Sequence, residues 1–583
     1  MSSSIQTAAT LLIAACMFSV NHSHAQVPFS IQGPGVESDD FRMTTFATGL
    51  NFPVGMQELS DGSIMVAVSN GNFFGSSSGS ILRLADTNGD GVADEQTTLF
   101  ADVPGGLLSS LRVIDDLVIA TGQGSGRPIA IMRAGETPSD PLSLVGEFEI
   151  NYNGRWLHPH SALEVRRTPG IEDSYDLLFQ LGSRTNFDTT TSTLSYESTF
   201  GLQGDLAGDA VHMITFTDDG ENLVGTEVQQ IATGLRNAAG FAWHPETGDL
   251  YVQDNGIDGV PDSNEPTSAD ELNVIPVEQI GGELEDFGFA ENYTEYRTNT
   301  IVGGEGIQPL VAFQPLPSPD GAEAEGPNDI AFAPAAFPEG LNNGIFVGMH
   351  GRFSLGGTEN EENPLVFVDL TDNSYFHFIG NDEEAIGHLD GLLATDDSVF
   401  LADISPSGGF ESSANNSGAI YQIQSLVQTP TSLDFNNDGL VNQDDAPFVC
   451  SLDDPTATVN ANGFFLGDVD LNGSVEFADF LILSASFGSA DAHYGMGDID
   501  CSSDVAFADF LILSSNFGAG VGIASVPEPT NCLLLAFAAL IALSGSRRKT
   551  ATRFSSHENE SVAATECFYS LRHGKRLVSC RNR

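Results

Sequence analysis

The sequence predicts an all-β fold, a six-bladed β-propeller, followed by a small α-helical module built on calcium-binding loops. The first observation is a turn rich in Asp, Asn, Gly or Ser that precedes a short apolar strand and recurs six times. These units lie at residues 60–68, 114–121, 175–182, 247–254, 342–348 and 395–403. Since each blade contributes such a turn and strand, six blades are expected between residues 42 and 424.

The second observation is a change of composition at residue 433, where acidic loops and apolar, helix-like runs begin. A separate domain is therefore expected over residues 433–518. Residues 467–488 and 497–518 are near-copies offset by 30 residues, and residues 433–445 form a third related loop. Oxygen-bearing side chains recur through twelve-residue loops, and in the first two a glycine at the sixth position permits the sharp turn that wraps a loop around Ca²⁺. The alternative is a set of solvated acidic loops without metal.

The predicted calcium ligands of the three loops follow from this spacing. The first loop offers Asp434, Asn436, Asp438, Asn442 and Asp445. The second loop offers Asp468, Asp470, Asn472, Ser474, Glu476 and Asp479. The third loop offers Asp498, Asp500, Ser502, Asp504 and Asp509. Ser503 replaces the glycine of the third loop, so we expect this loop to bind calcium more weakly.

A loop in the first predicted blade has a similar pattern. It carries Asp86, Asn88, Asp90 and Asp94, and is expected to tie two strands together through calcium. The alternative is a turn rich in Asp and Asn that needs no metal, because these side chains bond readily to their own backbone.

The charge of the chain limits its partners. The 583 residues include 80 acidic and 21 basic side chains, for a formal net charge of −59. Such a surface repels nucleic acid and anionic lipid and attracts cations. Nucleic-acid binding is therefore disfavoured.

The two ends of the chain resemble export signals. Residues 8–20 are apolar and precede a small-residue cleavage site, so residues 1–25 are expected to form a signal peptide, with a lipoprotein signal at Cys16 as the alternative. Residues 526–549 contain a Val-Pro-Glu-Pro segment, an apolar run and an Arg-Arg-Lys cluster, and resemble the PEP-CTERM sorting signal. The resemblance implies transient membrane contact and an exported location at the cell surface, in the extracellular matrix or in the periplasm. A plain short anchor is the alternative, and residues 550–583 are expected to form a basic, disordered tail.

The candidate site lies in residues 233–273. Arg236 and Asn237 sit on a Gly-flanked loop, and together they supply donors and an acceptor suited to a carbonyl or hydroxyl ligand. A loop position suggests that an Arg236→Ala variant folds normally. Asp270 and Glu271 form an acidic pair shortly after Gly256. The alternative is that these residues cap strands and hold turns.

This passage resembles the glucose/sorbosone dehydrogenase family of secreted propellers. The resemblance implies that Arg236 and Asn237 face a central cavity and bind pyrroloquinoline quinone (PQQ), and that Asp270 and Glu271, with backbone oxygens near Gly256, hold calcium. It also aligns His158 with the family's catalytic base, with His160 as the alternate, although either histidine could be structural. PQQ has three carboxylates, whereas the propeller lacks Lys and offers only Arg352 after Arg297. Basic side chains that could bind the quinone's carboxylates are therefore scarce.

The duplicated loops resemble type I dockerin modules, a family that binds cohesin modules through helix faces. Phe477, Phe480, Leu481 and Leu483 fall on or near one apolar helix stripe, which could serve such a partner or the module's own core. Cys450 and Cys501 are the two cysteines of the expected mature body, and an exported compartment permits them to pair.

Two functions are consistent with these features. The first is an oxidoreductase that oxidises a hydroxyl of a sugar or polyol. The second is a non-catalytic, calcium-stabilised propeller that binds glycan or matrix at the cell surface. The Arg236-Asn237 pair favours the first, and the scarcity of late-blade cations favours the second.

Overall fold

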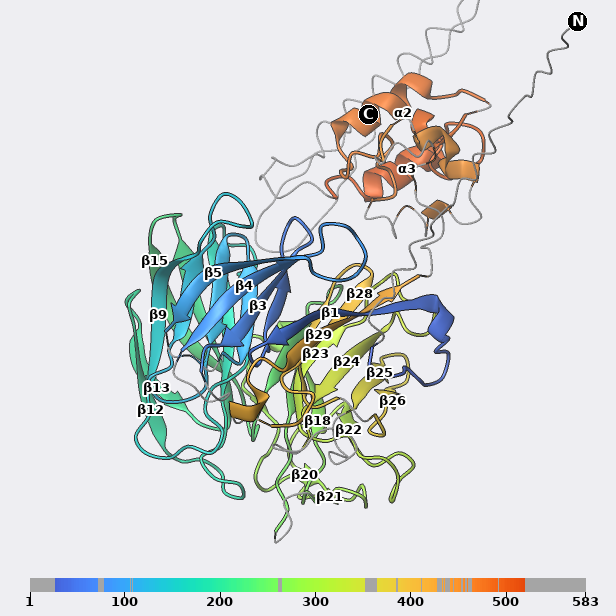
Figure 1. Ribbon diagram of the computed structural model, residues 1–583. Helices are drawn as coiled ribbons and strands as arrows, with labels where there is room; N and C mark the ends of the chain where they lie inside the picture. The colour runs from blue at the N-terminus through green and yellow to red at the C-terminus, as the bar shows by residue number, and fades with distance from the viewer. Residues whose placement is uncertain are drawn as a thin grey trace, which may run out of the picture. The chain divides into compact units, whose positions relative to one another are not determined.

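The computed structural model describes residues 27–519, except for several short segments. The segments not described are 72–77, 105, 107, 261–264, 352–363, 384–385, 410–411, 427–432, 434, 436–440, 444, 452–454, 457–458, 460–463 and 491. The chain divides into two compact units, Met1–Thr429 and Pro430–Arg583. Each unit is described by itself (Figure 1). Within the described residues, no helix combines the length and the apolar character needed to cross a bilayer.

Within the described residues, the first unit contains six mainly antiparallel sheets arranged as the blades of a propeller, which confirms the predicted fold class (Figure 1). Blade 1 contains β2 (Met56–Glu58), β3 (Ile64–Ser69), β4 (Gly79–Ala85) and β5 (Glu95–Val103). Blade 2 contains β6 (Ser110–Ile114), β7 (Leu117–Thr121), β8 (Ile129–Arg133) and β9 (Ser143–Asn151), extended by β12 (Thr193–Ser198) and β13 (Gln203–Ala207). Blade 3 contains β10 (Leu163–Arg167), β11 (Ser174–Leu181), β14 (Ala210–Asp218) and β15 (Leu223–Thr233), with β19 (Glu285–Asp286) added in parallel.

The remaining three blades follow the same plan. Blade 4 contains β16 (Gly240–Trp243), β17 (Leu250–Asp254), β18 (Glu271–Ile275) and β22 (Val311–Ala312). Blade 5 contains β23 (Pro327–Phe332), β24 (Gly344–Met349), β25 (Leu365–Asp369) and β26 (Ser374–Ile379). Blade 6 contains β27 (Leu389–Ala394), β28 (Ser398–Asp403), β29 (Gly418–Ser425) and β1 (Phe41–Leu50). The connections carry a hairpin of β20 (Tyr293–Thr294) and β21 (Ile301–Val302), and the short helices η1 (Ser38–Asp40), η2 (Val277–Gln279) and η4 (Ser412–Ala414).

The ring is closed by strands from its two ends. The first strand, β1, pairs antiparallel with the last, β29, from Phe41 opposite Ser425 to Leu50 opposite Gly418. β1 thereby becomes the outer strand of blade 6. The first and last strands of the propeller therefore pair with each other in one sheet.

The core lies between the faces of neighbouring blades. The strands β3, β4, β7, β11, β24 and β28 are buried along their whole length. Each therefore reads as a nearly continuous apolar run, because both faces of an inner strand contact other blades. The aromatic side chains of Phe346, Phe367 and Phe378 meet edge to face between blades 5 and 6, with ring centroids about 5.1 Å apart.

A buried charge network joins the innermost strands. Arg112 on β6 donates through Nε to Glu164 on β10, 2.9 Å away, and through Nη2 to Asp329 on β23, 3.2 Å away. Asp329 also accepts the backbone N–H of Leu392 on β27. All three charged side chains are at most 15% exposed. Burial raises the pKa of both Glu164 and Asp329, and the guanidinium of Arg112 opposes that shift.

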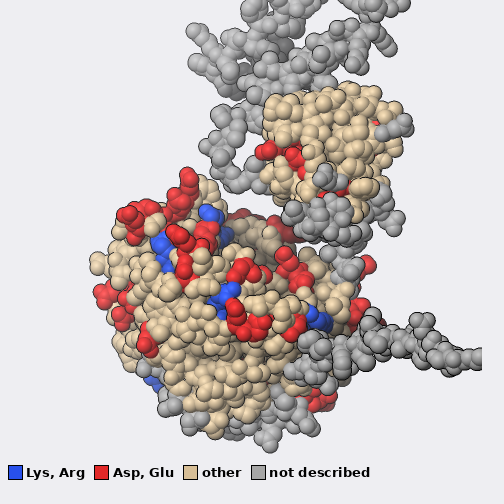
Figure 2. Space-filling view, turned by 45° about the horizontal axis from the view of Figure 1, so that its top comes forward, with Lys and Arg blue, Asp and Glu red and all other residues tan. Residues whose placement is uncertain are grey.

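Among the charged side chains on the face of the propeller drawn in Figure 2, acidic ones outnumber basic ones. Several arginines of the propeller are paired with carboxylates. Arg133 contacts Asp116 and Asp218 at 2.6 and 2.7 Å, and Arg167 contacts Asp115 at 2.6 Å. Because the chain has 80 acidic and 21 basic residues, most carboxylates are left without a basic partner.

The second unit is a small helical module. Its elements are η5 (Ala446–Ser451), α2 (Phe477–Ser486), η6 (Tyr494–Met496) and α3 (Phe507–Ser515). Phe480 and Leu483 of α2 enter the core with Leu513 of α3, whereas Phe477 and Leu481 are 56% and 51% exposed. The predicted apolar stripe is therefore divided between the core and the surface. Cys450 and Cys501 form a disulfide.

We expect Arg112→Met to destabilise the propeller strongly, because it leaves two buried carboxylates without their cation. Breaking such a pair reduces the free energy of unfolding by about 3–5 kcal/mol, to be measured by urea denaturation. Arg167→Met is the matched control, since its side chain is 62% exposed and its ion pair with Asp115 contributes roughly 0–1 kcal/mol. Equal losses in the two variants would contradict this role for Arg112.

Candidate functional site

A polar cavity of about 490 Å³ lies among the loops at one end of the innermost strands. It is lined by loops of blades 2 to 5, which are far apart in the sequence. The lining residues are Gln123, Leu157, His158, Ser161, Arg236, Asn237, Ala239, Asn255, Gly256, Asp258, Pro266, Asp270, Glu325, Gly326, Asn328, His350 and Gly351. The structure thus brings together five residues identified from the sequence: His158, Arg236, Asn237, Gly256 and Asp270.

Arg236 is buried, with 2% of its surface exposed. Its guanidinium donates to Asn186 Oδ1 at 2.7 Å and to the carbonyl of Asn255 at 3.2 Å, and it lies 2.8 Å from a carboxylate oxygen of Asp258. The expectation that Arg236→Ala leaves folding unaffected is therefore wrong. Although Arg236 is on a loop, its side chain fills the interior and holds two other loops together.

Two buried aspartates brace the same loops through backbone N–H groups. Asp254, at the end of β17, accepts the N–H groups of Arg236 and Asn237 at 2.9 and 2.5 Å. Asp270 accepts those of Gly256 and Gly326 at 2.5 and 2.8 Å. Burial raises the pKa of Asp254 to about 7 and that of Asp270 to about 6, because the N–H donors only partly replace water.

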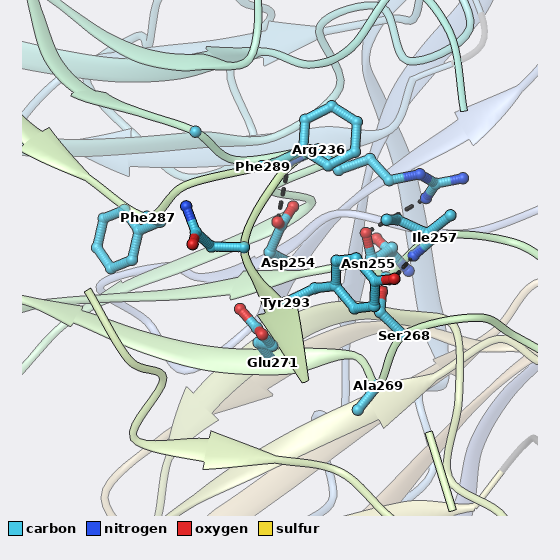
Figure 3. A pocket seen from close by; sticks show the side chains of 13 residues that line it. Arg236, Asp254, Asn255, Ile257, Ser268, Ala269, Glu271, Phe287, Phe289 and Tyr293 are labelled. Atoms are coloured by element: carbon cyan, nitrogen blue, oxygen red, sulfur yellow. Dashed lines mark hydrogen bonds between the residues drawn. The ribbon is translucent and has the colours of Figure 1, made fainter. Parts of the chain in front are cut away.

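Glu271 lies in a second, much smaller pocket that adjoins Arg236 and is shown in Figure 3. Its free volume of about 20 Å³ has room for one water or one ion. Among the described residues, the Glu271 carboxylate accepts one long hydrogen bond, 3.4 Å from Asn273 Nδ2. Burial, followed by repulsion from Asp254, raises the pKa of Glu271 to about 8. A poorly compensated buried carboxylate beside backbone carbonyls suits a cation such as Ca²⁺.

The two candidate histidines have different surroundings. His158 lines the cavity, and its Nε2 finds no hydrogen-bond partner among the described residues. Gly182 allows this packing, since a Cβ there would lie 2.8 Å from the Cβ of His158. Burial, and then the nearby positive charge of Arg236, lowers the pKa of His158 to about 2. His158 is therefore neutral at physiological pH, although it is a weak base.

His160 is placed away from the cavity lining. Its Nδ1 lies 2.7 Å from the hydroxyl of Tyr152, and its Nε2 lies 2.8 Å from the carbonyl of Arg127. The same hydroxyl accepts the backbone N–H of His160. A neutral imidazole with the proton on Nε2 satisfies all three contacts, so His160 has the bonding of a structural residue. Burial lowers its pKa to about 4.

The described lining does not fit PQQ well. Arg236 is the sole Arg or Lys among the described lining residues, and it is already paired with Asp258. Three lining residues, Asp258, Asp270 and Glu325, are acidic. A ligand with three carboxylates would meet repulsion here rather than a set of cationic clamps. Arg352 follows Gly351 of the lining but falls outside the described residues.

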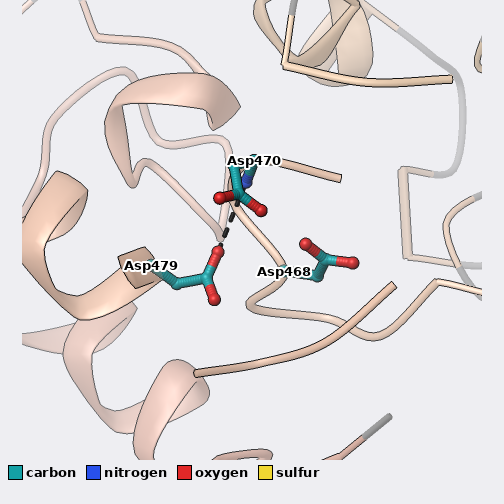
Figure 4. Close-up of side chains that lie close together, drawn as sticks. All are labelled: Asp468, Asp470 and Asp479. Carbon is teal, nitrogen blue, oxygen red and sulfur yellow. Dashed lines mark hydrogen bonds between the residues drawn. The ribbon is translucent and has the colours of Figure 1, made fainter. Parts of the chain in front are cut away.

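The second module loop gathers three carboxylates around a common space (Figure 4). Oxygens of Asp468, Asp470 and Asp479 lie within 4.8 Å of one another. Asp468 accepts the N–H of Gly473 at 2.8 Å, and Asp479 accepts that of Val469 at 2.7 Å. Asp470 Oδ1 is buried and without a partner among the described residues, so it is available as a cation ligand.

The other predicted ligands of this module are placed as follows. Asn472 Oδ1 accepts the N–H of Ser474, while Glu476 is the N-cap of α2. In the third loop, Asp498, Asp500 and Asp509 form a second three-carboxylate cluster, and Ser502 Oγ contacts the Asp504 carbonyl. In the first loop, Asp445 accepts the N–H of Asn442, whereas Asp434, Asn436 and Asp438 lie outside the described residues.

The loop in blade 1 has the hydrogen bonding of an Asp-rich turn. Asp86 accepts the N–H groups of Asn88, Gly89, Asp90 and Gly91 at 2.7–3.3 Å, and Asp94 accepts from Thr87. Among the described residues, this loop contributes no cluster of three carboxylates. A calcium role for Asp86, Asn88, Asp90 and Asp94 stays a prediction.

Sequence reasoning missed several residues of the cavity. Gln123, Glu325, Asn328 and His350 come from blades 2 and 5, and Asn186 supports Arg236 from a loop after β11. His350 directly follows β24 and Asn255 directly follows β17, while Gln123 is the second residue after β7. The recurring polar residue after the second strand of a blade was therefore the available signal.

No family model matches the chain. A 54-residue segment is 43% identical to an uncharacterized protein of Borreliella burgdorferi, and the match spans only 14% of that protein and 9% of this chain. Similar solved structures include a calcium structure of the Trichoderma reesei Carbohydrate-Active Enzymes Family AA12 protein, with 16% identity, a TM-score of 0.45, and coverage of 69% of this chain and 99% of that chain. They also include the holo form of the PQQ domain of pyranose dehydrogenase from Coprinopsis cinerea, with 14% identity, a TM-score of 0.45, and coverage of 69% of this chain and 99% of that chain. A further one is the apo form of the soluble aldose sugar dehydrogenase of Escherichia coli, with 14% identity, a TM-score of 0.42, and coverage of 66% of this chain and 99% of that chain.

We expect His160 to make the protein sensitive to acid. Its folded pKa of about 4 lies below the unfolded value of about 6.5, so the unfolded chain takes up the proton first as pH falls. The free energy of unfolding therefore decreases by roughly 1.4 kcal/mol per pH unit between pH 6.5 and 4 from this group alone. His160→Gln should be less stable at pH 7.5 but should show a smaller further loss on acidification, measured by urea unfolding at each pH. An unchanged pH slope would contradict the structural role.

Proposed function

We propose that the central cavity of the propeller binds a neutral sugar or polyol. The observation that carries this proposal is the buried acceptor Asn237 Oδ1, which has no hydrogen-bond partner among the described residues and lies in a cavity whose lining is otherwise rich in donors and acceptors. Asn237 Nδ2 is fixed by donation to Asn255 Oδ1, 3.0 Å away, so its carbonyl oxygen is held ready for a donor. A sugar hydroxyl supplies such a donor and can also accept hydrogen bonds from neighbouring groups.

The size and charge of the cavity support the same class of ligand. A volume of about 490 Å³ lies within the usual range for small-molecule sites. The acidic lining disfavours anionic sugars, because the positive charge of Arg236 is already used by Asp258. Neutral hydroxyl groups avoid that repulsion and still find Ser161, Asn237, Asn255 and Gln123 as partners.

Calcium is the metal that we propose for the protein. In the propeller, Glu271 and the backbone oxygens around its small pocket would hold one ion and stiffen the loops beside the cavity. In the module, the two three-carboxylate clusters would hold one ion each. Support comes from Asp470 Oδ1, which has no partner within the described segments, and from the Glu271 carboxylate, whose one hydrogen bond given there is long.

Oxidation of the bound sugar is the second candidate function. It is favoured by His158, whose neutral ring lies at the cavity near Arg236 and has a nitrogen without a partner among the described residues. Such a nitrogen can accept a hydrogen bond from a sugar hydroxyl, but its lowered pKa makes it a weak base for taking the proton. The hydride from the same carbon needs a separate acceptor, and the described lining does not fit the three carboxylates of PQQ. Binding without oxidation therefore remains the leading proposal.

The surroundings of the protein complete the proposal. The export signals and the dockerin-like repeats suggest a protein held outside the cytoplasmic membrane, with a cohesin-like partner for the module. An anionic, calcium-dependent propeller suits that setting, because calcium is abundant outside cells and binds best where several carboxylates converge. The two segments that resemble export signals lie outside the described residues, so both signals stay predictions.

We expect Asn237→Ala to weaken sugar binding about tenfold, because loss of one hydrogen bond of typical strength removes about 1.4 kcal/mol. Isothermal titration of the exported protein with aldoses, polyols and uronic acids measures this. Asn222→Ala, at an exposed turn before β15, is the control and should bind like the wild type. Failure of every neutral sugar and polyol to bind the wild type would defeat the proposal.

The same panel decides between binding and oxidation. Wild-type protein reconstituted with PQQ and calcium is tested with a dye as electron acceptor. Binding heat without turnover supports the leading proposal. Turnover that disappears in His158→Gln, while that variant still binds sugar, would establish the second candidate instead.

For the metal, we expect Asp470→Asn to weaken calcium binding by about tenfold or more at the second module loop. The substitution removes one carboxylate charge from the cluster but leaves the backbone-bonded Asp468 and Asp479 in place. Calorimetric titration of chelator-treated protein measures this, with the exposed Asp205→Asn as the control. Absence of calcium binding at millimolar concentration in the wild type would show that the loops are only solvated turns.

A further inference from the structure

The third module loop departs from the second at two positions where the backbone needs a left-handed conformation. In the second loop these positions hold Leu471, with φ 53°, and Gly473, with φ 90°. In the third loop they hold Cys501, with φ 54°, and Ser503, with φ 71°. A serine in this region is less favourable than glycine, because its Cβ crowds the backbone. The third loop therefore keeps the geometry of a calcium loop without the residue that normally permits it.

The two loops also differ in what anchors their fourth residue. Leu471 is 1% exposed and lies in the hydrophobic core of the module, so burial holds the second loop in place. Cys501 is instead bonded to Cys450, which packs against the same core from η5. Cys450 Sγ lies 3.6 Å from the carbonyl oxygen of Asp498, the first predicted ligand of the third loop. The disulfide thus occupies the structural place of the buried leucine.

We propose that the Cys450–Cys501 disulfide holds the third loop in its calcium-binding conformation, so that calcium affinity at this loop depends on the oxidised bridge. The inference rests on the proposed calcium binding of the module. Asp498 is held by the N–H groups of Ser502 and Ser503 at 2.9 and 3.0 Å. If Ser503 leaves its left-handed conformation, those bonds are lost and Asp498 separates from Asp500 and Asp509. The bridge on Cys501, two residues away, restrains the backbone against that change.

The bridge also connects two loops of the module. Cys450 follows Asp445, the last predicted ligand of the first loop, whereas Cys501 lies inside the third loop, 51 residues further along the chain. The bridge forms by thiol–disulfide exchange: a disulfide oxidant takes two electrons from the two cysteine thiols and leaves as two thiols. Full calcium affinity therefore arises only after the chain has met an oxidising compartment.

The test uses the full-length protein and hydrogen–deuterium exchange at stepped calcium concentrations, which gives a separate titration curve for residues 468–479 and 498–509. In Cys450→Ser/Cys501→Ser, and in wild type reduced with dithiothreitol, calcium affinity at the third loop should fall about tenfold, as for a loop whose binding conformation is populated only about one-tenth of the time. The second loop should keep its affinity and serves as the folding control. Adding Ser503→Gly to the double variant should recover most of the loss.

Two results would overturn the inference. If the reduced protein and the double variant both bind calcium at the third loop as tightly as the wild type, the bridge has no part in binding, although the loops do bind calcium. If the oxidised wild type shows no calcium dependence at either loop, the calcium proposal itself fails. If the double variant also loses calcium binding at the second loop, reduced wild type is compared with reduced Ser503→Gly. The proposal expects the glycine to restore calcium binding at the third loop, and failure to do so would overturn it.

Discussion

The buried contact of Arg112 with Glu164 and Asp329 is the interaction on which the centre of the propeller depends. It is made by residues of three different blades, and Asp329 extends it to a fourth through the N–H of Leu392. Carboxylates that converge on the axis of a ring would repel one another, and a single delocalised cation with five donors can satisfy two of them at once. The chain has only 21 basic residues, and Arg112 is one of them. Removal of Arg112 would leave two buried carboxylates without a counter-charge.

The aspartates around the cavity are held mainly by backbone N–H groups, with Arg236 as the nearby cation. Asp254 and Asp270 are each held by two backbone N–H groups, and these bonds join segments that come from different connections of blades 4 and 5. Arg236 links three further groups, so its loop behaves as part of the interior. In the part of the chain that the structure describes, Asn237 Oδ1 and His158 Nε2 have no hydrogen-bond partner, and both residues line the cavity.

Features that depend on residues close together in the sequence could be predicted, whereas features that depend on contacts between distant segments could not. The six turn-and-strand units and the duplicated module loops depend on nearby residues, and the structure has strands at all six positions and carboxylate clusters in loops two and three. Burial of Arg236 and the separation of His158 from His160 depend on contacts between loops distant in sequence, which periodicity does not report. The extra strands β12 and β13 joined to blade 2, and the contributions of Glu325 and His350 to the cavity, were missed for the same reason.

The pairing of β1 with β29 determines when the propeller can be complete. Blades 1 and 5 are built from four consecutive strands, and blades 2 to 4 draw their strands from neighbouring segments of the chain, whereas blade 6 must wait for the last strand to meet the first. Closing so long a stretch of chain is slow, because its entropy is lost before the contacts that compensate for it are made. Until that moment β1 is an unpaired edge, and an exported chain would need it shielded from other chains.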